Sequence, residues 1–260
     1  MENIVNLEEK NKKGDPFNFK RKVYHLGGLI IPGMLYFDGF SFLHLNKFTN
    51  DTRSITFFAI ALVFVCMGIA EIIRFRSPAF QKFFLGIFGK MLKDKEVNNV
   101  QASIPFLFAN AFIIGFFPKE VAVIAIFFLT FGDPAAAYFG GKYGTIRFYN
   151  KKSLQGVLGG IIGGFSFALL FSVFLAITRN DEPFFALWAS SGIQWATVAT
   201  IFLGAIVAML AEFVSKDGFF DDNLSIPMTS AIIMTFFISV FQDKPFWDYI
   251  NSIEKLIMFK

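Results

Sequence analysis

Apolar residues occur along this chain in blocks of about 20, the length that crosses the hydrocarbon core of a bilayer as a helix. Short polar segments separate the blocks. Inside a bilayer the backbone must satisfy its own hydrogen bonds, so we expect helices. The pattern predicts an all-α, polytopic transmembrane bundle of about seven spans: Tyr24–Leu43, Ile55–Ile73, Val100–Phe117, Glu120–Phe139, Leu154–Ile177, Ile193–Val214 and Ile226–Phe241.

Two further segments mix apolar and polar residues at helical spacing. Ser77–Leu92 and Phe246–Lys260 are predicted to be amphipathic helices that lie at the membrane interface. Residues 1–22 are polar and are predicted to form a cytoplasmic tail. Because no repeat or long linker divides the remainder, residues 23–260 are predicted to form a single integral membrane domain.

Basic residues are distributed unevenly between the two sides that this topology defines. With a cytoplasmic N-terminus, 17 of the 24 Lys and Arg residues fall in cytoplasmic segments, which is the bias that orients membrane proteins. The C-terminus is then expected on the opposite side. A net charge of +4 carried in loops indicates membrane orientation rather than nucleic-acid binding. Cys66 is the only cysteine, which excludes an intramolecular disulfide and a cysteine-cluster metal site.

The densest polar segment runs from Gly132 to Gly156. Asp133 falls within a span, where an ionisable side chain is costly and marks a candidate functional site. Pro134 removes a backbone donor and frees a carbonyl nearby. Glycines allow a ligand to approach the backbone closely, and Ser153 is placed to cap the next helix, whose N-terminus attracts anions. The candidate nucleotide contacts are Gly132, Asp133, Gly140, Lys142, Gly144, Lys152, Ser153 and Gly156.

A carboxylate, glycines and lysines together are what a metal–polyphosphate site needs. The alternative is an ordinary connection between membrane helices, where glycines are common and orientation bias alone places lysines. The segment is not a P-loop, because Gly-x4-Gly-Lys-Ser/Thr does not occur.

Asp221, Asp222 and Asn223 form a second acidic cluster. Asp222 and Asn223 are candidate metal ligands together with Asp133, although Asp and Asn also favour helix caps and turns. Glu212, inside an apolar span ten residues before Asp222, favours a functional role for this region.

Charged residues near the ends of the first two spans complete the candidate set. Glu71 and Arg74 are one helical turn apart, so they form either an ion pair or part of the same pocket. Arg21 and Lys22 suit orientation and phosphate contact, and His25 could bind a headgroup, a phosphate or a carboxylate. With Glu212, these residues are the candidate contacts to a lipid headgroup.

Six short motifs in order resemble the dolichol kinase, phytol kinase and CTP-dependent diacylglycerol kinase family. The motifs are Arg21-Lys22-x-x-His25, Glu71-x-x-Arg74, Gly132-Asp133-x-x-Ala136, Gly140-x-x-x-Gly144, Lys152-Ser153-x-x-Gly156 and Asp222-Asn223-x-x-x-Pro227. Members of that family are integral membrane enzymes that phosphorylate a lipid alcohol, generally with CTP.

The resemblance implies that residues 23–260 are a catalytic domain with a cytoplasmic active site. The expected reaction moves the γ-phosphate of CTP to the hydroxyl of a polyprenol such as dolichol, a phytol-like isoprenoid or diacylglycerol. Asp133, Lys152 and Asp222 are the expected catalytic residues. Asp133, Asp222 and Asn223 are the expected ligands of Mg²⁺.

Two alternatives stay open at this point. The stretch from Asp133 to Gly140 also resembles phosphatidate cytidylyltransferase, which makes a CDP-lipid. Gln155 stands where both groups usually have Glu, but the C-terminal signature of the cytidylyltransferases is missing, which favours the kinase branch. A membrane transporter is the alternative of another class; transporters often contain inverted repeats, and the sequence shows none.

Overall fold

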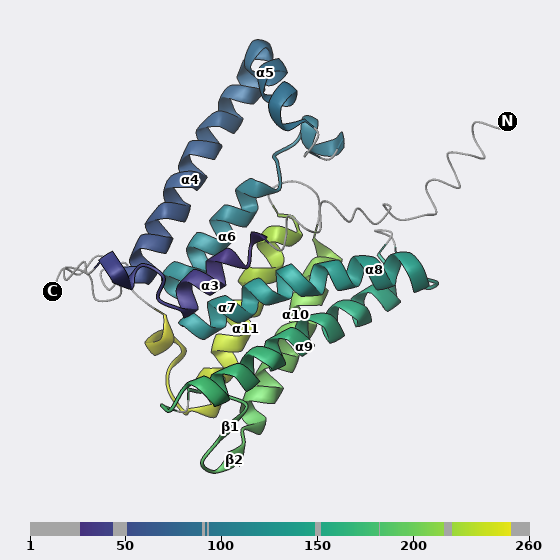
Figure 1. Ribbon diagram of the computed structural model, residues 1–260. Helices are drawn as coiled ribbons and strands as arrows, with labels where there is room; N and C mark the ends of the chain where they lie inside the picture. The colour runs from purple at the N-terminus through teal and green to yellow at the C-terminus, as the bar shows by residue number, and fades with distance from the viewer. Residues whose placement is uncertain are drawn as a thin grey trace.

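Long apolar helices form the frame of the computed structural model, which describes residues 27–43, 51–89, 92, 94–148, 152–181, 183–215 and 220–250 (Figure 1). Five helices in the described part are long and apolar enough to cross a membrane. They are α4 (Asp51–Arg76), a continuous helix Lys119–Tyr143, α9 (Leu154–Thr178), α10 (Trp195–Val214) and α11 (Asp222–Phe241). They indicate a multi-pass membrane protein and confirm the predicted all-α class.

The central helix has three parts. It begins as α7 (Lys119–Phe127), widens into a π-helix at Phe128–Gly132 and continues as α8 (Asp133–Tyr143). The sequence predicted a glycine-rich loop from Gly140 onward, and this was wrong for residues 140–143, which are helical. Glycine is a poor helix former in isolation, but close packing against α9 favours the helix here.

The first and third predicted spans are shorter than the pattern indicated. α6 (Ser103–Phe116) has 14 residues, about 21 Å at ~1.5 Å per residue, and ends before Pro118, because a residue preceding proline disfavours helix. α3 (Ile30–Tyr36) has 7 residues and is followed by Asp38, whose φ is +47°. Residues 24–26 lie outside the described part. The seven expected spans thus become five long helices and two shorter ones.

The first amphipathic segment is a helix, as predicted. α5 (Pro78–Phe88) starts at Ser77, whose hydroxyl accepts the Phe80 amide at 3.3 Å. It buries Phe84 and exposes Phe83. Of the second segment the structure describes only residues 246–250, which begin with the 3₁₀-helix Phe246–Tyr249. Location at the interface stays a prediction for both.

Short elements connect the long helices. The connection from α9 to α10 contains an antiparallel pair, β1 (Trp188–Ala189) and β2 (Gly192–Ile193). Gly192 has a φ of +107°, which suits the turn because glycine has no Cβ to clash. Two more 3₁₀-helices lie at Ser41–Leu43 and Asp94–Val97.

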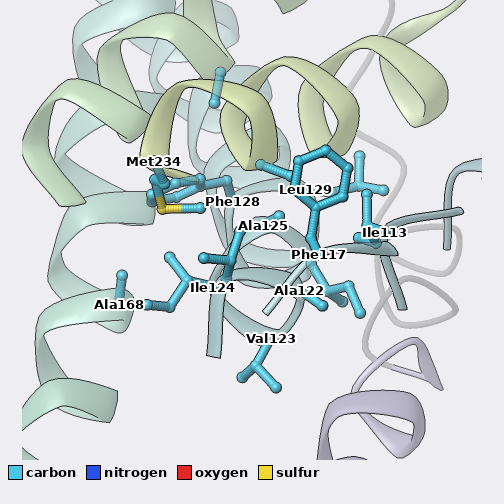
Figure 2. Close-up of a cluster of buried hydrophobic side chains, with 14 of the residues drawn as sticks. Ile113, Phe117, Ala122, Val123, Ile124, Ala125, Phe128, Leu129, Ala168 and Met234 are labelled. Atoms are coloured by element: carbon cyan, nitrogen blue, oxygen red, sulfur yellow. The ribbon is translucent and has the colours of Figure 1, made fainter. Parts of the chain in front are cut away.

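The core surrounds α7 and the π-helix. Residues 121–126 are all buried, which is expected of a helix that is apolar on every side and has neighbours all round. Figure 2 shows Phe128 against Met234 of α11, with Ile124 extending toward Ala168 of α9. The helix that carries Asp133 is therefore the most enclosed one.

Candidate functional site

Asp133 lies where the central helix changes its winding. It follows the π-helix directly, is the first residue of α8 and is only 6% exposed. Pro134 has no N–H to donate to the carbonyl of Thr130 one turn earlier, and π-turns are frequent at functional sites. The local backbone thus places a buried carboxylate inside a membrane helix, which is a feature of functional sites.

Glycines of the predicted nucleotide site line the seam between α8 and α9, which lie side by side in Figure 1. A Cβ added to Gly140 would lie 3.3 Å from the Cα of Gly156, and one added to Gly132 would lie 3.3 Å from the carbonyl oxygen of Gly160. These contacts are tighter than ordinary van der Waals contact, so a larger residue at either position requires its neighbour on α9 to shift. Packing therefore explains these glycines, and contact of their backbone with phosphate stays a prediction.

Ser153 caps α9, as the sequence predicted. Its hydroxyl accepts the amide of Gly156 at 3.1 Å. The amide of Gly144 donates to the carbonyl of Gly140 at 3.2 Å. Because these two amides are already bonded, a phosphate bound here would use side chains or other amides at the start of α9.

Gln155 fastens the connection between α8 and α9. Its Oε1 accepts the amides of Thr145 at 3.2 Å and Ile146 at 3.4 Å, and its Nε2 donates to the Thr145 hydroxyl at 2.6 Å. The amide of Leu154 donates to the Ile146 carbonyl at 2.9 Å. Gln155, which stands where the resembled enzymes usually have Glu, thus holds the loop beside the predicted nucleotide contacts.

Lys152 and Glu212, predicted separately, meet in the structure. The Lys152 Nζ donates to the backbone carbonyl of Glu212 and to the Ser215 hydroxyl at 3.3 Å, and lies 3.7 Å from Glu212 Oε1. The Lys152 side chain is 29% exposed. The ammonium therefore joins the start of α9 to the end of α10, where a cation stabilises the carbonyl end of a helix, and it stays accessible to solvent.

Lys142 has a different environment from Lys152. It is exposed, donates to the Tyr138 hydroxyl at 3.2 Å and lies over the rings of Tyr138 and Tyr143 at 5.5 and 5.1 Å. These contacts hold its charge on the outer surface of α8.

The second acidic cluster forms the start of α11. Asp221 is the cap: its carboxylate accepts the amides of Asn223 at 3.0 Å and Leu224 at 3.3 Å. The Asn223 side-chain amide donates to Asp221 at 2.7 Å and to Asp222 at 3.1 Å. The capping alternative is therefore right for Asp221, and Asp222 is the half-buried carboxylate of the first turn.

Carboxylate and amide oxygens of Asp133, Asp222 and Asn223 are the predicted ligands of Mg²⁺. Among the described residues no group of three or more His, Cys, Asp or Glu is arranged to hold a metal ion. Mg²⁺ typically uses one or two carboxylates together with substrate phosphates and water. Asp133 and Asp222 carry oxygen donors of that kind, and a metal held between them and a nucleotide stays a prediction.

Glu71 and Arg74 form a buried clamp. Arg74 donates to both oxygens of Glu71 at 2.9 and 2.7 Å and to the carbonyls of Val97 and Asn99 at 2.7 and 2.9 Å. Glu71 also accepts the amide of Gln101 at 3.0 Å. The hydrogen bonds of this pair connect α4 to the segment before α6. Of the two alternatives given by the sequence, an ion pair or part of the pocket, the structure shows the ion pair.

Three of the predicted headgroup contacts, Arg21, Lys22 and His25, lie outside the described residues. The sequence reasoning gave the Asp221 cap as one of two alternatives and missed the loop contacts of Gln155. An Asp one residue before a helix signals the cap. No sequence signal identifies the loop contacts of Gln155, because these depend on how the chain folds back.

The fold and the polar groups together define a class: a polytopic membrane protein with a buried carboxylate in its central helix and an accessible lysine near the start of α9. No family model matches the chain, and no solved structure matches it either.

The chain is distantly homologous to fungal CTP-dependent diacylglycerol kinases. It is 29% identical over 210 residues to CTP-dependent diacylglycerol kinase 1 of Eremothecium gossypii, covering 78% of this chain and 66% of that protein. The identities to the proteins of the same name from Saccharomyces cerevisiae and Schizosaccharomyces pombe are 26% and 28%. Those alignments cover 82% and 67% of this chain, and 74% and 78% of the relatives. The aligned part is thus just under two thirds of the first relative.

Proposed function

We propose that this protein is a CTP-dependent lipid kinase that phosphorylates the hydroxyl of a membrane lipid alcohol. The observation that carries the proposal is the homology to three proteins named as CTP-dependent diacylglycerol kinases, at 26–29% identity. Diacylglycerol is the first candidate substrate for that reason. Polyprenol and phytol-like isoprenoids are further candidates, since they also combine one hydroxyl with an apolar body.

The site residues take these proposed roles. Asp133 lies nearest the reacting phosphate, where a carboxylate can hold Mg²⁺ or accept the hydroxyl proton. Asp222 and Asn223 are the further proposed metal contacts. Mg²⁺ bound with CTP would neutralise phosphate charge.

Lys152 is the proposed triphosphate contact, supported by its partial exposure at the junction of α9 and α10. The start of α9 adds a favourable helix dipole for anions. Phosphoryl transfer depends mainly on positioning and charge neutralisation, so residues that fix Lys152 and the loop after α8 contribute by holding geometry.

The proposed orientation has the N-terminus and this site at the cytoplasmic face and the C-terminus on the opposite side. The support is the distribution of Lys and Arg, 17 of 24 on the N-terminal side of a seven-span topology. That topology also requires the chain to cross at α6, which has 14 residues, and in the region of α3, which has 7.

Product analysis tests the proposal. Detergent-purified protein is incubated with Mg²⁺, CTP and one lipid at a time: diacylglycerol, a polyprenol, phytol or phosphatidate. CDP together with a phosphorylated lipid is expected. Pyrophosphate with a CDP-lipid would assign the protein to the cytidylyltransferases. Neither product, with ATP also tried, would contradict both enzyme assignments and favour a transporter.

A further inference from the structure

An apolar groove lies on the side of the central helix away from the polar site. Its volume is about 380 Å³, within the ~300–1,000 Å³ of small-molecule sites. α3 supplies Pro32 and Gly33, the central helix supplies Phe127 and Phe131, and α9 supplies Phe167 and Phe171. Among the described residues no charged side chain lines it.

The groove and Asp133 are on opposite faces of one helix. Phe131 lines the groove, with its ring stacked on Phe167 at 3.7 Å between centroids. Asp133 is two residues further along, and positions i and i+2 of a helix point in opposite directions. A molecule in the groove is therefore separated from the proposed catalytic carboxylate by the helix itself.

Polar groups lie at one end of the groove, near the start of α7. The Tyr36 hydroxyl, at the groove's edge, is 2.8 Å from the Thr178 hydroxyl. The Lys119 ammonium lies 5.9 Å from the centre of the Tyr36 ring and 3.2 Å from the Asp38 carboxylate. Arg179, the residue after Thr178, forms an ion pair with the Asp181 carboxylate at 2.6 Å. This end presents charges of both signs.

Aromatic residues indicate that this end is at the membrane–water interface. All three tryptophans lie at the same ends of the long helices: Trp188 lies between α9 and α10, Trp195 is the first residue of α10, and Trp247 follows α11. Trp and Tyr concentrate at headgroup depth. The groove thus extends from this end along the helices, and its wall residues Phe37 and Leu170 are exposed on the outer surface.

We infer that this groove binds one acyl chain of a bilayer phospholipid whose zwitterionic headgroup lies beside Tyr36, Lys119 and Arg179. At this depth the groove opens to the hydrocarbon chains of the bilayer. Its aromatic side chains are apolar, so contact with an acyl chain buries apolar surface. A headgroup with both charges matches the two ion pairs at the polar end. The bound phospholipid is a resident lipid of the fold and is distinct from the lipid alcohol that reacts.

Gly33 provides a variant that fills the groove. A Cβ added there meets no atom within 4 Å, and the residue has no positive φ. Gly33→Leu therefore adds a side chain to the groove wall with open space at its Cβ, and it raises helix propensity in α3. Gly68 of α4 has equally open space around it and lies away from the groove, so Gly68→Leu is the matched control.

Native mass spectrometry of the detergent-purified full chain, after washing and incubation with phosphatidylethanolamine vesicles, tests the inference. Wild type and Gly68→Leu are expected to retain one phospholipid per protein. The affinity of Gly33→Leu for the phospholipid is expected to be about tenfold lower, a loss of ~1.4 kcal/mol in binding free energy. The KM for the lipid alcohol is expected to stay unchanged in Gly33→Leu. Equal retention in all three proteins would overturn the inference, as would release of the bound lipid by the lipid alcohol.

A second measurement needs no variant. Phosphatidylethanolamine with a photoreactive group in one acyl chain is crosslinked to wild-type protein, and the adducts are mapped. Adducts on residues 29–37 and 167–174 are expected, and adducts spread evenly over the outer helix faces would contradict the site. Binding here does not depend on kinase activity, so an inactive protein with these adducts would refute only the proposed function.

Discussion

Arg74 and Lys152 are both cations of the predicted site, and they differ in how much of their bonding capacity the fold uses. Arg74 is 1% exposed, and its guanidinium makes four hydrogen bonds to Glu71, Val97 and Asn99. Lys152 is 29% exposed and is held by the end of α10. A motif in sequence does not separate a cation that clamps the fold from one that can meet a ligand. Burial and hydrogen-bond geometry do.

The largest effect is expected at Asp133, which, like Lys152, is proposed to contact the substrates. Asp133→Asn keeps the size of the side chain and removes its charge, so phosphate transfer is expected to fall on the order of 1,000-fold. Thermal unfolding in detergent is expected to change little. Initial rates of lipid phosphorylation at saturating CTP measure the effect.

Asp181→Asn is the matched carboxylate control. The hydrogen bond from Arg179 lowers the pKa of Asp181 to about 2, so Asp181 is ionised at neutral pH, and it lies beyond the end of α9, away from Asp133. Its replacement is expected to leave the rate unchanged. Retention of more than about a tenth of the rate in Asp133→Asn, a loss below ~1.4 kcal/mol, would remove Asp133 from the centre of the mechanism.

Arg74→Met is expected to act on stability. It leaves the buried Glu71 carboxylate without its partner, which costs about 3–5 kcal/mol in the free energy of unfolding. The double variant with Glu71→Gln is expected to recover part of this loss, because no uncompensated charge remains. Denaturant titration in detergent micelles measures both. Arg179→Met, which breaks an exposed ion pair, is the control and is expected to change the free energy of unfolding little.

The contrast between Arg74 and Lys152 would be contradicted if Arg74→Met folded normally but raised the KM for CTP. Arg74 would then contact the nucleotide, and the clamp would be incidental to its role. An unchanged KM in the folded fraction supports the clamp.

Lys152→Met is expected to raise the KM for CTP about tenfold, equal to ~1.4 kcal/mol of lost phosphate contact. Stability is expected to fall by only ~1 kcal/mol, because the lost bonds to the end of α10 are partly solvated. Lys119→Met removes a lysine paired with Asp38 at the opposite end and serves as the control. Equal KM values for the two variants would show that Lys152 is, like Arg74, a residue of the fold alone.

Gln155→Glu is expected to change the KM for CTP less than threefold, below ~0.7 kcal/mol. A glutamate keeps both backbone contacts to the loop and can accept a bond from the Thr145 hydroxyl in place of the present one. Gln155→Leu loses all of these contacts, and its KM is expected to rise further. If Gln155→Glu instead weakened CTP binding as much as Gln155→Leu, charge near the phosphates would explain why this chain carries Gln.

The sequence predicted where helices occur more accurately than it predicted where they begin and end. Apolar length identifies α4 and α9 because every backbone group in a bilayer must be bonded within its own segment. It overestimated α3, since the apolar run continues past Tyr36, whereas Asp38 takes a positive φ and Ser41–Leu43 is a 3₁₀-helix. It ended α8 too early, because glycines that break an isolated helix also let two helices pack closely.

For the candidate site, the sequence predicted which residues are polar at membrane depth but not how they pair. The Lys152 contact with Glu212 joins residues 60 positions apart, and neither position reveals the other without the fold. The Glu71–Arg74 pair was one of two readings, since residues three apart on a helix are neighbours. Its enclosure by the segment before α6 was not predictable from spacing.

The fate of the phosphates of CTP distinguishes a lipid kinase from a cytidylyltransferase. Protein reconstituted in vesicles with diacylglycerol and Mg²⁺ is given CTP labelled on either the α- or the γ-phosphate. We expect the γ-label in the lipid product and the α-label in soluble CDP, with neither transferred by Asp133→Asn. Recovery of the α-label in the lipid, or no labelled lipid from wild-type protein, would contradict the assignment as a CTP-dependent lipid kinase.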